Sequence, residues 1–173
     1  MNQRDLDKPL TKAILCPVCA QRGRKVLLFT VHSVTREDFI RTLCDDDYYF
    51  CASPDCAVVY YGAFLNAIVK KDWLKTRVGL KEKNAPRPVC YCFGYTIEDI
   101  HREIQETAGS TVEKEIADKI EAGLCHCEDA NPEGRCCLGR VATAVKEGFC
   151  LYGGESEAQN VSIAAAQDCC EPQ

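Results

Sequence analysis

The sequence predicts an α+β fold of two small modules, a β-rich one followed by a helical one. Short runs of branched and aromatic residues mark the first half, whereas helical periodicity with start and stop signals marks the second. A polar stretch with two prolines, residues 81–88, lies between them and is expected to be a linker. With 173 residues, 46% of them hydrophobic, the chain is long enough to form one or two cores.

The first module is expected over residues 12–80. Branched and aromatic residues predict one strand over residues 25–34 and another over residues 57–61. Between these strands, a Thr-x-x-Asp spacing favours a short capped helix over residues 35–41. Short strands joined by turns are therefore expected to carry the functional groups of this module.

The second module is expected over residues 89–150. Capping patterns at Thr96 and Ser110 predict the starts of two amphipathic helices, and Gly109 and Gly123 stand where each helix should stop. The two helices should form a hairpin. A third helix follows the last cysteines of this module and turns three apolar residues inward: Leu138, Val141 and Val145.

The chain ends and the charge distribution complete the predicted organisation. Residues 1–11 and 151–173 are expected to be tails. Up to Asn84 there are fourteen Lys and Arg against ten Asp and Glu, a charge of +4, and the rest has seven against sixteen, a charge of −9. Nucleic-acid binding is disfavoured for the second half, because phosphate contacts need a basic face.

Fourteen cysteines dominate the chemistry of the chain. Residues 1–10 are charged and no apolar run follows them, so the sequence predicts neither a signal peptide nor a membrane span. A reducing cytoplasm is the expected location, where clustered cysteines hold metals more often than they form disulfides. Most of the cysteines fall into close groups: Cys16/Cys19, Cys51/Cys56, Cys90/Cys92, Cys125/Cys127 and Cys136/Cys137.

Two of these groups predict a zinc site in the first module. Cys16 and Cys19 have the C-x2-C spacing of a zinc knuckle, and Cys51 and Cys56 form a second turn with C-x4-C spacing. Four thiolates from two turns make a closed tetrahedral site, as in structural Zn²⁺ centres. Cys44 is the expected replacement if one of the four is not a ligand.

The remaining groups predict an iron-sulfur site in the second module. The C-x-C pair Cys90/Cys92 precedes the helical hairpin, and further cysteines follow it. Thiolates at helix starts meet unpaired N–H groups and the positive end of the helix dipole, which favours an anionic cluster. The cysteines after the hairpin are Cys125, Cys127, Cys136 and Cys137.

Longer motifs around these cysteines resemble a known family. The segments at residues 89–96 (VCYCFGYT) and 134–139 (GRCCLG) resemble the bacterioferritin-associated ferredoxin-like [2Fe-2S] domain. The segment at residues 48–60 (YYFCASPDCAVVY) is similar to the zinc-binding domain that accompanies it in CopZ-type copper chaperones. The resemblance covers residues 12–148. It implies zinc in the first module, a [2Fe-2S] cluster in the second, and a role in redox handling and delivery of copper.

Two departures from the family pattern limit what can be carried over. Gly134 stands where the family's last C-x2-C motif would have its first cysteine, so the partner of Cys137 must come from the preceding loop. By elimination the expected cluster ligands are Cys90, Cys92, Cys127 and Cys137. Cys125 or Cys136 is able to substitute for either Cys127 or Cys137.

The second departure concerns copper. The family's C-terminal copper domain carries an M-x-C-x-x-C motif, and Met1 is the only methionine here, so delivery by that domain's docking loop is not expected.

The sequence therefore predicts a non-enzymatic metalloprotein whose cluster transfers single electrons. Its acidic second half suits a basic redox partner protein. No phosphate-binding loop or hydrolase motif is present. One alternative is an electron-transfer subunit of a larger oxidoreductase. Another is a cargo protein that binds copper or another soft ion through spare thiols, namely Cys44, Cys150, Cys169 and Cys170.

Overall fold

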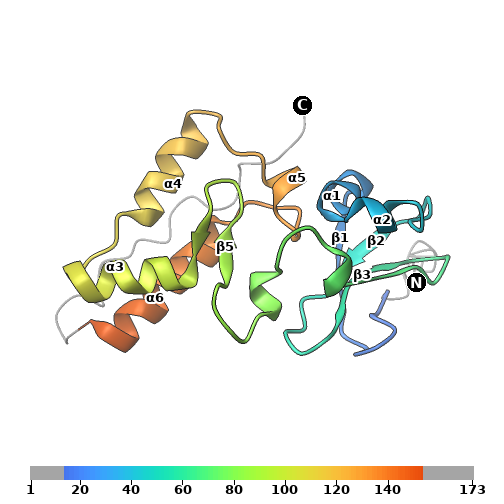
Figure 1. The fold of residues 1–173 in the computed structure, drawn as a ribbon, viewed down its shortest axis with the longest axis horizontal. Helices are drawn as coiled ribbons and strands as arrows, with labels where there is room; N and C mark the ends of the chain where they lie inside the picture. Colours follow the sequence, from blue (N-terminus) through green and yellow to red (C-terminus); the bar gives the residue numbers. More distant parts are fainter. Residues whose placement is uncertain (1–13, 154–173) are drawn as a thin grey trace, which may run out of the picture.

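The computed structural model describes residues 14–153, which form a mixed helix and sheet structure (Figure 1). The strands are β1 Arg24–Val26, β2 Tyr48–Phe50, β3 Val58–Gly62, β4 Ile68–Lys70, β5 Pro88–Cys90 and β6 Tyr95–Thr96. The helices are α1 Leu28–Val34, α2 Glu37–Ile40, α3 Ile97–Thr107, α4 Val112–Glu121, α5 Cys127–Ala130 and α6 Leu138–Tyr152, with 3-10 turns η1 Lys71–Trp73 and η2 Gly79–Lys81. The expected combination of helices and strands is confirmed.

The first four strands form one antiparallel sheet in the order β1-β2-β3-β4. The strand predicted over residues 57–61 is confirmed as β3, in which Tyr60 pairs with Phe50 of β2. The rings of Phe50 and Tyr60 meet edge to face with centroids 6.0 Å apart, and both residues are buried with Tyr48. These aromatic rings fill the core beside the sheet. Residues 14–81 form the sheet half of the molecule.

The strand predicted over residues 25–34 is wrong beyond its first residues. β1 ends at Val26, and the chain then forms helix α1. Thr30, Val31 and Val34 are buried along this helix, a spacing that places them on one helical face. The β-branched residues therefore pack as a helix against the rest of the molecule, and this packing outweighs their strand propensity.

A short helix is confirmed after α1, but its predicted cap is wrong. α2 begins at Glu37, after Arg36, and no side chain caps it. The Thr35 hydroxyl instead donates a 2.6 Å hydrogen bond back to the Val31 carbonyl oxygen, which closes α1. The Thr35 hydroxyl therefore ends α1 and does not cap the helix that follows it.

The two helices predicted in the second half are confirmed as α3 and α4, but the predicted hairpin is not: each helix packs mainly against α6 and not against the other. One of the two predicted caps is correct. The Asp99 N–H donates to the Thr96 hydroxyl over 3.1 Å, and the Asp99 carboxylate accepts from the Thr96 N–H over 3.0 Å, a complete capping box. The N-cap of α4 is Thr111 and not Ser110, whose hydroxyl donates to the Glu103 carboxylate and accepts from the Val112 N–H over 3.4 Å.

Helices α3, α4 and α6 enclose the second core. α3 lies along α6 (Figure 1), and Ile100 and Ile104 of α3 are buried there. Gly148 of α6 allows this close approach, because a Cβ atom at this position would lie 2.5 Å from the Ile104 Cδ1 atom. Val141 and Val145 are buried in the same core, as expected. Residues 88–153 are called the helical half below.

The two halves are in contact, with α5 beside α1 (Figure 1). The Thr30 hydroxyl donates to the Glu128 carbonyl oxygen over 2.6 Å, and the Tyr60 hydroxyl donates to the Pro132 carbonyl oxygen over 2.6 Å. Arg24 of β1 reaches Glu133 with both an ion pair and a hydrogen bond. The sheet half thus holds the loop that leads to Cys136 and Cys137.

Within residues 14–153, no helix is long and apolar enough to cross a membrane.

Candidate metal centre

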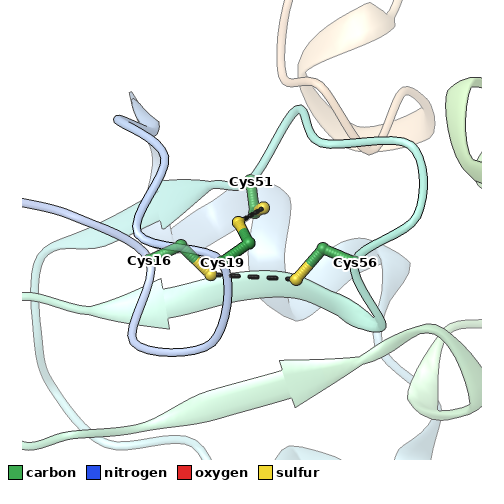
Figure 2. A group of neighbouring side chains, drawn as sticks. All are labelled: Cys16, Cys19, Cys51 and Cys56. Atoms are coloured by element: carbon green, nitrogen blue, oxygen red, sulfur yellow. Dashed lines mark hydrogen bonds between the residues drawn. The ribbon is translucent and has the colours of Figure 1, made fainter.

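Four cysteines of the sheet half converge on one point (Figure 2). Their sulfur atoms all lie within 4.8 Å of one another: Cys16, Cys19, Cys51 and Cys56. The Cys16 and Cys56 sulfurs are 3.9 Å apart, and those of Cys19 and Cys51 are 3.5 Å apart. In a tetrahedral site with Zn–S bonds of about 2.3 Å, neighbouring sulfurs are about 3.8 Å apart. The four sulfurs therefore have the spacing that a zinc ion requires.

Two turns present these sulfurs. In the first turn the Cys16 N–H donates to the Gln21 carbonyl oxygen over 2.9 Å, and Ala20 takes a positive φ of 57°. The second turn joins β2 to β3, and the Cys51 N–H donates to the Val59 carbonyl oxygen over 2.8 Å across its base. The sheet thus fixes both ends of the second turn, and the first turn brings Cys16 and Cys19 next to it.

The thiols of this group resist simultaneous ionisation. Burial opposes ionisation of Cys19, but hydrogen bonds from the Gln21 N–H and from the Cys51 thiol lower its pKa to about 7. Burial raises the pKa of Cys51 to about 12, and the neighbouring Cys19 acts in the same direction. Cys19 therefore ionises more readily than Cys51, and a divalent cation would stabilise the thiolate form of the group.

Disulfide bonding does not explain this arrangement. Every cysteine between residues 14 and 153 has a free thiol. The shortest sulfur pairs of this group, 3.5 and 3.9 Å, are far longer than the roughly 2.05 Å of a disulfide bond. Cys44, the expected replacement ligand, is exposed and lies outside the group, with its thiol 4.0 Å from the Thr42 carbonyl oxygen.

A second group of thiols lies in the helical half. The sulfurs of Cys92, Cys125 and Cys127 lie within 4.8 Å of one another. Cys127 is central, with its sulfur 3.4 Å from that of Cys92 and 3.5 Å from that of Cys125. Cys136 also contacts Cys127, and this hydrogen bond together with burial raises the pKa of Cys136.

The other two predicted ligands form a pair beside this group. A hydrogen bond with Cys137 lowers the pKa of the buried Cys90. Cys90 ends β5, while Cys127 begins α5 and Cys137 directly precedes α6. The structure therefore brings the four predicted ligands into one region with Cys125 and Cys136, and it does not single out four of the six.

Backbone groups also point at the second set of sulfurs. The His126 N–H, just before α5, donates to the Cys92 sulfur over 3.4 Å. Burial raises the pKa of Cys92, so holding it as a thiolate needs compensating positive charge. Beside Cys127, a cavity of about 420 Å³ is lined by Cys125, His126 and Cys136.

The remaining thiols are separate from both groups. Cys150 is exposed on α6. Cys169 and Cys170, the expected accessible pair, lie outside the residues that the structure describes.

Comparison with known proteins identifies the family. A family model described as a zinc binding domain, zf_CopZ, matches residues 13–75. The chain is also 35% identical over 148 residues to the copper chaperone CopZ of Archaeoglobus fulgidus, covering 86% of this chain and 68% of that protein. The chain belongs to the CopZ family. The X-ray structure of the A. fulgidus CopZ N-terminal domain superimposes with a TM-score of 0.61 at 37% identity, covering 74% of this chain and 97% of that one.

The family assignment confirms the resemblance to the zinc-binding domain of CopZ-type chaperones and supports Zn²⁺ as the metal of the first thiol group. All four cysteines of that group fall inside the matched zinc-binding domain, so the donor set and the family both indicate Zn²⁺.

The sequence does not predict the burial of two charged residues, one beside the zinc turn and one in the loop between α5 and α6. Lys81 was assigned to the start of a polar linker, yet it is buried against the zinc turn. Glu133 was assigned to a polar loop, yet it is buried among three arginines. No pattern in the sequence indicates that Lys81 and Glu133 are buried, and Lys and Glu are usually exposed.

Proposed function

We propose that this CopZ-family protein handles copper with two resident metal groups. Zinc bound by Cys16, Cys19, Cys51 and Cys56 maintains the fold of a first unit, residues 12–80. A [2Fe-2S] cluster in a second unit, residues 89–150, supplies single-electron transfer. Its proposed ligands are Cys90, Cys92, Cys127 and Cys137.

One observation carries the cluster assignment: a second set of thiols gathers at helix starts, apart from the zinc group. Cys127 begins α5 and Cys137 directly precedes α6, and the His126 N–H just before α5 donates to the Cys92 sulfur over 3.4 Å. Such donors stabilise thiolates that ligate an anionic cluster. The similarity to a protein named as a copper chaperone supports copper as the metal being handled.

The charge of the chain supports a protein partner for the electron. From residue 85 onward there are seven Lys and Arg against sixteen Asp and Glu. An acidic unit of this kind is steered toward a basic patch, which raises the encounter rate more than the affinity. We propose a basic redox protein as the electron donor or acceptor, in a reducing cytoplasm.

A specific observation favours a second candidate function, a cargo protein for a soft metal ion. Cys125 and Cys136 both lie beside Cys127, in addition to the four proposed cluster ligands. Thiolates such as these suit Cu(I). In this alternative the thiol group of the helical half binds the transported ion and no cluster forms.

Metal analysis of anaerobically purified protein tests the proposal. We expect about two iron, two sulfide and one zinc per chain. Cys92→Ser should abolish the visible cluster spectrum and leave zinc bound, and Cys19→Ser should do the reverse. Cys150→Ser, at an exposed thiol, is the matched control and should change neither. Loss of both metals from either ligand variant would refute two separate sites, and bound copper without iron would favour the cargo protein.

A further inference from the structure

Lys81, the last residue of η2, is a buried lysine beneath the zinc turn. Only 3% of the residue is exposed. Its Nζ donates hydrogen bonds to two backbone carbonyl oxygens of the turn, Ser53 at 2.6 Å and Cys56 at 3.1 Å. The ammonium group also lies 6.0 Å from the centre of the Phe50 ring. These contacts place a positive charge next to the zinc ligands.

This charge has no carboxylate partner within residues 14–153. The neighbouring cations Lys71 and Arg77 both pair with Glu82 at 2.8 Å, whereas Lys81 takes part in no ion pair of the described structure. An ammonium group removed from water without a counter-charge is strongly unfavourable. Carbonyl dipoles satisfy its hydrogen bonds but do not neutralise its charge.

The zinc ligands can supply the missing negative charge. A Zn²⁺ ion with four thiolates carries a net charge of about −2. Four protonated thiols, or two disulfides, would be neutral and would leave Lys81 uncompensated. The metal-bound, fully ionised state of the four cysteines therefore compensates the charge of the buried lysine best.

We propose that Lys81 is the buried counter-ion of the zinc–thiolate centre. Its charge stabilises the thiolates, and its two hydrogen bonds hold the turn that presents Cys51 and Cys56. Lys81 is thus a positioning residue that slows the loss of zinc. This inference rests on the four-cysteine zinc site of the proposed function.

Zinc transfer from the full-length holoprotein to a colorimetric chelator tests the role of Lys81. Outer-sphere partners of metal ligands typically contribute about 10- to 100-fold to metal affinity, so Lys81→Met should accelerate zinc release by about that factor. Lys81→Gln keeps a hydrogen-bond donor without the charge and should release zinc about as fast as Lys81→Met. Lys81→Arg keeps the charge and should slow the release again.

An exposed lysine that also contacts the zinc turn provides the matched control. Lys83 pairs with Asp55 at 2.7 Å, but 79% of its side chain is exposed. Lys83→Met should leave zinc release unchanged within about twofold, since exposed pairs contribute little. Far-UV circular dichroism should confirm that each variant is folded before zinc release is compared.

The outcomes separate this inference from the zinc site on which it rests. Wild-type protein without zinc would refute the site itself. Stoichiometric zinc with wild-type release from Lys81→Met would refute only the role of Lys81. Recovery of wild-type release by Lys81→Gln would show that hydrogen bonding, and not charge, is what matters, and would also overturn the proposal. If Lys81→Met does not fold, the comparison of Lys81→Gln with Lys81→Arg decides.

Discussion

Replacement of Glu133 by glutamine should destabilise the contact between the two halves. Glu133 is 8% exposed and lies in the loop between α5 and α6. Its carboxylate accepts from the Arg140 Nε over 2.9 Å and from Arg135 over 3.1 Å, and pairs with Arg24 of β1 at 3.7 Å. Glutamine keeps the shape but removes the charge that holds three guanidinium groups together.

The size of this effect follows from the exposure of the partners. The three arginine side chains are 36 to 53% exposed, so each pair should contribute about 0.5–1 kcal/mol, as partly solvated pairs do. The loss should therefore total about 1.5–3 kcal/mol, less than the roughly 3–5 kcal/mol for breaking a fully buried pair. For a chain of this size that corresponds to a fall in melting temperature of about 3–12 °C.

Thermal unfolding followed by far-UV circular dichroism measures this change. Glu106→Gln, at an exposed position of α3, is the control and should stay within about 0.5 kcal/mol of wild type. Glu133 lies between Cys127 and Cys137, so the variant should also lose its visible cluster absorbance faster. A melting temperature within 1 °C or so of wild type would refute the counter-charge role of Glu133.

Two further predictions concern the ambiguous ligands and the partly buried ion pairs of Glu82. Cys137→Ser should lose or strongly shift the visible cluster spectrum, whereas Cys125→Ser should keep it. If Cys125→Ser loses the spectrum and Cys127→Ser keeps it, Cys125 and not Cys127 is the ligand. Burial opposes ionisation of Glu82, but hydrogen bonds from Lys71 and Arg77 lower its pKa below the usual value. A lowered pKa gives stability that is complete above the unfolded pKa of about 4.3 and is lost as the pH falls through the folded value. Urea unfolding should therefore show Glu82→Gln about 1–2 kcal/mol less stable at pH 7, with the gap closing below about pH 4; a constant gap would contradict the ion pair.

Local spacing predicted the parts of the fold that depend on local contacts. The Thr96 and Asp99 capping box, three residues apart, forms as expected because both partners lie in one helical turn. The C-x2-C and C-x4-C spacings likewise lead to two local turns, although the sulfurs of the two turns meet only because the sheet brings these distant segments together. In the capping box and within each turn, the residues that decide the geometry lie a few positions apart in the sequence.

Contacts between distant segments explain what the sequence did not predict. Residues 28–34 have strand-forming composition but pack as a helix, because Thr30 and Val31 are buried on one face and Thr30 bonds to the α5 region. The choice among Cys125, Cys127, Cys136 and Cys137 also depends on how α5 and α6 meet. The structure places all four together with Cys90 and Cys92, so their ligand roles remain a prediction.

The contact between the halves suggests how the zinc site serves the second thiol group. The loop before Cys137 is held by side chains of the sheet half, among them Thr30 through Glu128 and Tyr60 through Pro132. At about 1 kcal/mol for each hydrogen bond, these contacts and the Arg24 pair couple the halves by about 2–3 kcal/mol. That coupling is too weak to decide whether a cluster forms, but it can change how long the cluster lasts. Zinc loss in Cys19→Ser should therefore leave the cluster spectrum in place and shorten its lifetime under a chelator. An unchanged lifetime would mean that the sheet half holds this loop without zinc.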